Sequence, residues 1–146
     1  VGTLPINLSC TEKLGAKREI ASFVLPLGMT INMNGTAIMQ VVATLFIAGC
    51  AGYDVTLSQI IVVALLALIA SAGTPAAPGA GAIILFTILS GLGYINDGAL
   101  LAYSLILAIN RPIEMLVTAL NVVGDSATAI YVAKSEGMLN EDIYNS

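Results

Sequence analysis

Five polar residues that could bind a cation or a small solute recur within sixteen positions of the sequence, at Asn110, Glu114, Thr118, Asn121 and Asp125. At about 100° per residue, Asn121 and Asp125 each fall within about 20° of Glu114 around a helix, and the other two lie one turn on either side of it. Carboxylate and amide oxygens are hard ligands that suit alkali cations. This polar ribbon therefore predicts a site for Na⁺ or H⁺ together with a small solute.

A structural alternative is that the ribbon only supplies hydrogen bonds between packed helices. In that case Arg111 would neutralise Glu114, which lies three residues later on the same face. Charged residues in the middle of a membrane cost at least ~2.5–3.5 kcal/mol each on insertion scales, so they need a compensating role. Five polar residues lie on one face of the helix, and two of them are carboxylates. This pattern favours a binding site over helix packing alone.

The composition is that of an integral membrane protein. Hydrophobic residues make up 58% of the chain and charged residues 10%, with a mean hydropathy of +0.94; soluble domains average about 45–50% and about 25%. The net charge of -4, without a basic run, excludes a nucleic-acid partner. Cys10 and Cys50, in a chain without histidine, offer neither a zinc site nor a disulfide framework, and we interpret both as small apolar fillers.

Four apolar stretches are candidates for membrane helices, and they differ in length: Ile20–Gly49, Val55–Ala72, Ala82–Gly93 and Ala99–Ala133. A crossing helix needs about 20 apolar residues, so the third stretch is too short. It follows the second through a segment rich in Gly and Pro, residues 73–81. Such a segment at membrane depth must lie against protein or a watery cavity, which predicts a re-entrant hairpin.

The first stretch is interrupted by helix breakers and small polar residues, so we expect an unwound segment with free carbonyls and amides in mid-membrane: Pro26, Gly28, Thr30, Asn32, Asn34, Gly35 and Thr36. Basic residues lie before this stretch and at Lys134, whereas the loops around Asp54 and Asp97 have none. The positive-inside rule then places both ends of the chain in the cytoplasm. The chain opens with Val1 and lacks a signal-peptide pattern, so we expect it to be part of a longer protein.

Three motifs in order resemble those of the glutamate transporter family, the dicarboxylate/amino acid:cation symporters. Asn32-Met33-Asn34-Gly35-Thr36 is similar to the Asn-Met-Asp-Gly-Thr signature of the family's broken seventh helix. The segment 71–81 resembles the tip of its second re-entrant hairpin, and residues 121–125 resemble the Asn-Val-x-Gly-Asp of its eighth helix. Gly2-Thr3-Leu4-Pro5 is similar to the sequence after the tip of the first hairpin.

The resemblance implies an all-α membrane protein, with a broken transmembrane helix, a re-entrant helical hairpin and a long amphipathic transmembrane helix of an elevator-type transporter. Residues 1–146 would be the C-terminal part of its transport domain. The expected parts are the end of the first hairpin, the seventh helix, the second hairpin, the eighth helix and a cytoplasmic tail, at residues 1–11, 20–50, 55–93, 97–134 and 135–146. A multi-pass protein of the plasma membrane, embedded in lipid and assembled as a homotrimer, is expected.

The resemblance also implies ligand sets, with Na⁺ or H⁺ as the coupling ion and no other cofactor. One Na⁺ site would use carbonyls of Gly28, Asn32 and Asn121 with the Asp125 carboxylate. A second would use Thr30, Met33, Ser71, Ala72 and Thr74. The expected substrate-binding residues are Thr36, Ala72, Gly73, Pro78, Gly81, Glu114, Val117, Thr118 and Asn121.

Two residues depart from the family pattern: Asn34 replaces an aspartate that helps to hold a third cation, and Val117 replaces the arginine that pairs with an acidic side chain. We therefore expect a symporter, not an enzyme, that favours neutral amino acids. The alternative is an acidic amino acid or C4-dicarboxylate symporter in which Arg111 takes the anion. More distant alternatives are a channel subunit and an intramembrane aspartyl protease. The protease would need Asp54, which is expected in an outer loop, to meet Asp125.

Overall fold

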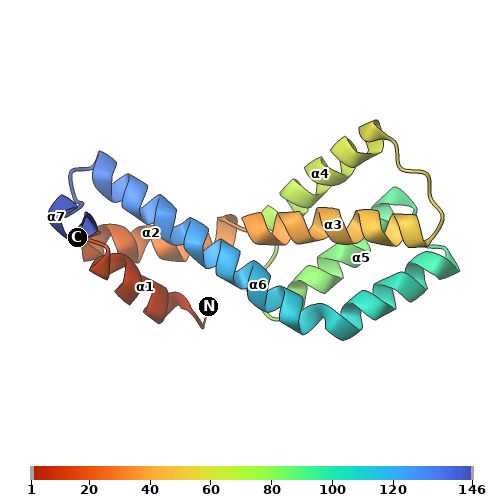
Figure 1. Cartoon of the computed structure of the whole chain (residues 1–146), viewed down its shortest axis with the longest axis horizontal. Coiled ribbons are helices and arrows are strands. Elements are labelled where there is room, and N and C mark those ends of the chain that lie inside the picture. Colours follow the sequence, from red (N-terminus) through yellow and green to blue (C-terminus); the bar gives the residue numbers. More distant parts are fainter. Residues whose placement is uncertain (1, 146) are drawn as a thin grey trace.

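The structure, a computed structural model, describes residues 2–145, and in this part the regular secondary structure is α-helical apart from an isolated bridge between Ala16 and Leu139. This confirms the predicted all-α class. Its helices, shown in Figure 1, are α1 (Leu4–Lys13), α2 (Arg18–Ile31), α3 (Asn34–Cys50), α4 (Leu57–Ala72), α5 (Ala80–Leu92), α6 (Asp97–Ser135) and α7 (Glu141–Tyr144).

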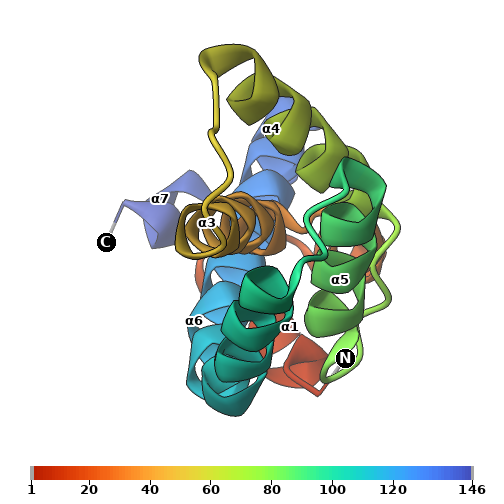
Figure 2. The same ribbon diagram turned by 90° about the vertical axis from the view of Figure 1, so that its right-hand side faces the viewer.

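The molecule is elongated, and α6 runs along most of its length. In Figure 1, α1, α2 and α7 lie with the second half of α6 at one end, and α3, α4 and α5 lie with its first half at the other. Figure 2 looks along the long axis from the α3–α5 end. The 39-residue α6 changes direction near its middle, and Pro112 lies inside it. Proline lacks the N–H of the helical ladder and crowds the carbonyl four residues earlier, which accounts for the bend.

The first apolar stretch is two helices separated by a short break. Asn32 (φ -96°, ψ 89°) and Met33 (φ -117°, ψ 42°) leave the helical region, and α3 begins at Asn34. Among residues 2–145, two apolar helical stretches are long enough to cross a membrane: Arg18–Cys50, taken together, and α6. The break is narrower than the sequence suggests, because Asn34, Gly35 and Thr36 belong to α3.

Helices α4 and α5 form a hairpin, and both are too short to cross a membrane. Thr56 begins α4 with a capping box, in which its hydroxyl and the Gln59 side chain each accept a bond from the other's backbone amide. Gly79 adopts a left-handed conformation (φ +84°) immediately before α5. Helix α5 begins at Ala80, two residues before the predicted start, so Gly81 lies in its first turn.

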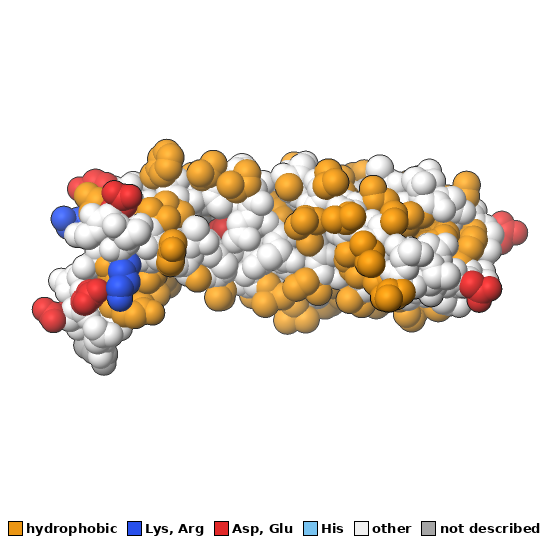
Figure 3. Space-filling model, turned by 90° about the horizontal axis from the view of Figure 1, so that it is seen from above, with side chains coloured by type: hydrophobic (Ala, Val, Ile, Leu, Met, Phe, Trp, Pro, Cys, Tyr) orange, Lys and Arg blue, Asp and Glu red, His pale blue; other side chains and the backbone are white. Residues whose placement is uncertain are grey.

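A buried apolar cluster joins α3, α5 and the first half of α6 through residues such as Ala43, Ile47, Leu85, Leu89 and Ile106. Many other large apolar side chains stay exposed. On the face shown in Figure 3, apolar side chains cover the middle of the molecule, while most charged side chains lie at its ends. Cys10 and Cys50 are free and exposed, so they are not the packed fillers that the sequence suggested.

Candidate functional site

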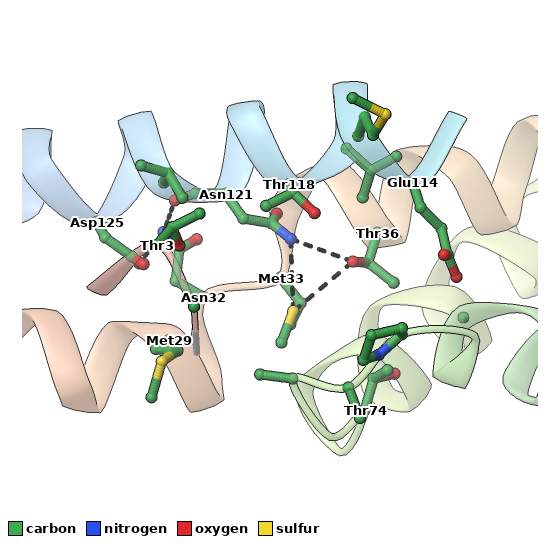
Figure 4. Close-up of a pocket in the computed structure, with 18 of the residues that line it drawn as sticks. Thr3, Met29, Asn32, Met33, Thr36, Thr74, Glu114, Thr118, Asn121 and Asp125 are labelled. Carbon is green, nitrogen blue, oxygen red and sulfur yellow. Dashed lines mark hydrogen bonds between the residues drawn. The ribbon is translucent and has the colours of Figure 1, made fainter. Parts of the chain in front are cut away.

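A cavity of about 630 Å³ lies where the break between α2 and α3, the tip of the α4–α5 hairpin and the middle of α6 meet. Figure 4 shows Asp125 with Asn32 at one end and Glu114 at the other, with Asn121 and Thr36 between them. Eleven of the residues predicted to bind ligands line it: Asn32, Met33, Thr36, Thr74, Pro78, Gly81, Glu114, Val117, Thr118, Asn121 and Asp125.

At one end of the cavity, a carboxylate lies against the break in the first apolar stretch. Asn32 Nδ2 donates to Asp125 Oδ1 at 2.8 Å and to the Asn121 carbonyl at 3.4 Å. Asp125 is only 5% exposed. A Cβ at Gly28 would lie 2.5 Å from Asp125 Oδ1, so the backbone of α2 approaches the carboxylate as only glycine allows. The structure thus brings together all four residues of the first predicted cation set.

In the middle of the cavity, Asn121 ties the start of α3 to α6. Its Oδ1 accepts a hydrogen bond from the Gly35 amide at 2.8 Å, and its Nδ2 donates to Thr36 Oγ1 at 3.2 Å and to Met33 Sδ at 3.4 Å. These dashed contacts with Thr36 and Met33 are visible in Figure 4. A Cβ at Gly35 would lie 2.7 Å from the Val117 carbonyl, so α3 also approaches α6 closely here. The side chain of Asn121 therefore holds the broken segment in place.

At the other end, Glu114 uses both carboxylate oxygens. Oε1 accepts from the Gly79 amide at 2.9 Å, and Oε2 pairs with Arg111 Nη1 at 3.0 Å. The Arg111 side chain is 70% exposed and the Glu114 side chain 19%. Gly79 immediately precedes α5, where unpaired amides and the helix dipole favour an anion. Arg111 and Glu114 form the ion pair expected if the polar ribbon only served helix packing, but Glu114 also accepts a hydrogen bond from the hairpin tip.

The second predicted cation set is not assembled. Met33 and Thr74 line the cavity, whereas Thr30, Ser71 and Ala72 do not. The hydroxyls bond to carbonyls of the preceding turn: Thr30 to Leu27, Ser71 to Leu68 and Thr74 to Ala70, at 2.7–2.9 Å. Gly73 and Gly28 also lie outside the cavity lining. In residues 2–145 no hydrogen bond joins Thr30 to the hairpin tip.

The sequence was matched by the model of the sodium:dicarboxylate symporter family over residues 1–135. The chain belongs to this family. It is 39% identical over 139 residues to human excitatory amino acid transporter 2, covering 92% of the chain and 24% of that protein. It is 39% identical over 129 residues to an excitatory amino acid transporter of Caenorhabditis elegans, covering 87% of the chain and 25% of the relative. The proton/sodium-glutamate symport protein of Bacillus caldotenax is 37% identical over 139 residues, with 95% and 32% covered.

Membership of the sodium:dicarboxylate symporter family confirms the resemblance based on the three motifs. The family and these relatives are membrane transporters, so the chain is not part of an enzyme and the aspartyl protease alternative is wrong. The family is named for symport of sodium and dicarboxylates, and the relative from Bacillus caldotenax is named for symport of protons or sodium with glutamate. The chain spans 24–32% of the length of these relatives.

Several residues that line the cavity of this family member were not predicted from the sequence. Asn7 of α1 lines it, accepts a hydrogen bond from the Ser126 hydroxyl and donates to the Val122 carbonyl at 3.4 Å. The cavity lining also includes three methionines that were not predicted, Met29, Met39 and Met115, in addition to the predicted Met33. Flexible thioether side chains adapt to irregular spaces. Asn7 is a single polar residue outside any repeating pattern. The sequence alone therefore does not show whether its side chain lines a cavity or packs between helices.

Proposed function

We propose that the complete protein carrying this chain is a Na⁺- or H⁺-coupled symporter of acidic amino acids or C4-dicarboxylates. This is the alternative from the sequence, and the names of the relatives, which are glutamate or excitatory amino acid transporters, support it better than a neutral substrate. The observation that carries the proposal is the pairing of Arg111 with Glu114 at 3.0 Å in the cavity lining.

The argument from this pair is one of charge matching. An acidic amino acid carries an ammonium group and a second carboxylate. The ammonium can replace Arg111 at the Glu114 carboxylate, and Arg111, which is largely exposed, can then take the second carboxylate of the solute. A neutral amino acid would leave Arg111 without a partner. Val117 has no charge with which to bind the second carboxylate. Arg111 is the positively charged side chain in the cavity lining that can do so.

We assign the first coupling cation to Asp125, with the carbonyls of Gly28, Asn32 and Asn121. The close approach of Gly28 and the 2.8 Å bond from Asn32 to Asp125 support this assignment. A cation would take the place of the Asn32 amide against the carboxylate. The second set consists of Thr30, Met33, Ser71, Ala72 and Thr74. Its hydroxyls would first have to break their hydrogen bonds to carbonyls of the preceding helical turn. We therefore propose that this set forms only when the hairpin tip moves. Asn34 stands where the family has an aspartate that helps to hold a third cation, so this position carries no negative charge here.

We also propose the arrangement expected from the resemblance for the complete protein. The chain would be the C-terminal part of a transport domain that moves as an elevator within a homotrimer in the plasma membrane. Residues 55–93 would be the extracellular gate, and Ala72, Gly73, Pro78 and Gly81 its contact with substrate. On the face in Figure 3, Lys and Arg side chains lie only at the end that holds α7, which supports a cytoplasmic position for both ends of the chain.

The test is competition uptake by the complete protein in liposomes under a Na⁺ gradient. Aspartate, glutamate and succinate should compete strongly, and Arg111→Ala should abolish that competition. Arg18→Ala is the matched control, because Arg18 pairs with Glu12 at 3.7 Å outside the cavity lining. Strong competition by alanine and serine that persists in Arg111→Ala would instead establish the neutral substrate class.

A further inference from the structure

A chain of polar side chains joins α1 to α6. The Thr11 hydroxyl donates to Ser126 Oγ at 3.2 Å, and the Ser126 hydroxyl donates to Asn7 Oδ1. Asn7 Nδ2 in turn donates to the Val122 carbonyl at 3.4 Å. Thr11 is 0% exposed and Asn7 is 6% exposed, so breaking these bonds would leave buried polar atoms unpaired. All three hydrogen bonds cross from one helix to the other, and together they fix how α1 and α6 face each other.

On α6, this chain contacts the same helical turn that carries two members of the first cation set. Asn121 and Asp125 lie one turn apart on one line along the helix, and Val122 and Ser126 lie one turn apart on the neighbouring line. The first line is held by Asn32, which bonds to the Asn121 carbonyl and to Asp125 Oδ1. The second line is held by the side chains of α1. This turn of α6 is therefore held on two sides.

Helix α1 can act as a fixed support because its far end is anchored as well. The turn after α1 pairs with the segment between α6 and α7, where the Lys17 amide donates to the Met138 carbonyl at 3.1 Å and the Asn140 amide donates to the Gly15 carbonyl at 2.8 Å. Gly15 has a φ of +97°, and a Cβ there would lie 2.6 Å from the Asn140 carbonyl oxygen. Glycine is the residue that allows this approach. Helix α1 is thus bonded to α6 by its side chains and to the chain after α6 by its last turn.

Hydrogen bonds behind the ligands of a metal ion often decide how well the ion binds. They orient the ligands, and their removal typically lowers metal affinity about 10–100-fold. Ser126 is outside the cavity lining, so its hydroxyl can influence a bound cation only through its neighbours. Asn7 lines the cavity, but its side chain is bonded to Ser126 and to the Val122 carbonyl.

We propose that Asn7 and Ser126 are positioning residues for the first coupling cation. By joining α6 to α1, they fix the Asn121 carbonyl and the Asp125 carboxylate at the spacing that the cation requires. This inference rests on the cation assignment made under the proposed function. If the polar chain served only helix packing, its loss would lower the stability of the fold and leave cation affinity unchanged, so experiment can separate the two roles.

Ser126→Ala in the complete protein tests the positioning role without changing a residue of the cavity lining. The Na⁺ concentration for half-maximal substrate binding should rise several-fold, while substrate affinity at saturating Na⁺ should change little. Ser126→Thr, which keeps the hydroxyl, should restore the original Na⁺ dependence. Ser104→Ala is the control, because the exposed Ser104 hydroxyl bonds to the Leu101 carbonyl of its own helix, α6. A Ser126→Ala protein with the Na⁺ dependence of the Ser104→Ala control would overturn the proposal.

Thermal unfolding with Na⁺ alone gives a second readout that needs neither substrate nor transport. A cation that binds the folded protein raises its unfolding temperature, and choline at the same ionic strength corrects for salt. This rise should be smaller in Ser126→Ala and in Asn7→Leu than in the unchanged protein. Because both substitutions break the same chain, the double variant should respond little less than either single variant. Single variants that unfold earlier in choline but keep the full rise with Na⁺ would show a packing role and overturn the proposal.

Asp125→Asn separates this proposal from the cation assignment on which it rests. A lost Na⁺ response in Asp125→Asn, with the full response in Ser126→Ala and Asn7→Leu, would leave the assignment standing and overturn only the positioning role. A full response in Asp125→Asn would overturn both. The expected result is a lost response in Asp125→Asn and a reduced response in the other two variants.

Discussion

The Glu114 carboxylate and the Gly79 amide, 35 residues apart in the sequence, form a 2.9 Å hydrogen bond that fastens the tip of the α4–α5 hairpin to α6. The second oxygen of Glu114 pairs with Arg111. One side chain thus contacts the proposed gate and the residue that we propose binds the substrate anion. An amino group that enters the cavity would compete for this carboxylate, so substrate binding and the position of the hairpin tip are linked at Glu114.

Glu114→Gln should separate amino-acid substrates from dicarboxylates. The amide oxygen of glutamine can still accept from Gly79, but the charge that attracts an ammonium group is lost. Hydrogen bonds to charged groups contribute about 1.5–3 kcal/mol, so the apparent affinity for aspartate should fall roughly ten- to a hundredfold. Succinate, which has no amino group, should lose much less. Equal losses for aspartate and succinate in competition uptake would show that Glu114 acts only on the hairpin and not on the amine.

Asp125→Asn should abolish or greatly weaken Na⁺-dependent substrate binding by the complete protein. Asp125 is almost fully buried and bonded to Asn32, and a bound cation is the partner that would balance its charge in the membrane. Asn34→Asp, which restores the acidic residue of the family motif, should leave Na⁺ dependence intact or make it steeper. Binding measured over a series of Na⁺ concentrations checks both variants. If Asp125→Asn keeps the same Na⁺ dependence, the cation site does not include this residue.

Helical phase predicted much of the site. Glu114, Thr118, Asn121 and Asp125 all line the cavity, as expected for one face of α6. Asn110 has the same phase and is buried, but it does not line the cavity. Helical phase gives the direction of a side chain around the helix and does not show which neighbour it meets at each position along the helix. The bend at Pro112 separates Asn110 from the cavity-lining part of the ribbon.

Other features of the site leave no pattern in the sequence. The Gly79 amide that bonds Glu114 is a backbone group, so no residue type marks it. Thr30 and Ser71 match positions of a cation set, yet a threonine or serine in a helix can bond to a carbonyl of its own preceding turn, and both do. A motif shows which residues are present, but these local hydrogen bonds decide which oxygens are free to bind a cation.

Single cysteines should report the orientation of the chain in the membrane. Cys10 and Cys50 are exposed, so both must first be replaced. Tyr53→Cys and Asp97→Cys, near the acidic end of the molecule, should then react with an impermeant thiol reagent added outside intact cells. Lys17→Cys, at the basic end, should react only after the membrane is opened. Labelling of Lys17→Cys in intact cells, with protection of the other two, would reverse the proposed topology.

Gly28→Ala should weaken cation binding although it adds only one methyl group. The new Cβ would lie 2.5 Å from Asp125 Oδ1 and 2.9 Å from its Cγ, so either α2 or the carboxylate must move. Crowding of this kind costs about 1–3 kcal/mol, and here it falls on the atoms that we propose hold the cation. The Na⁺ concentration for half-maximal substrate binding should therefore rise several-fold. Gly49→Ala is the matched control, because it is also helical and a Cβ there has no neighbour within 4 Å. A Gly28→Ala protein with the Na⁺ dependence of the Gly49→Ala control would place the cation away from the contact between Gly28 and Asp125.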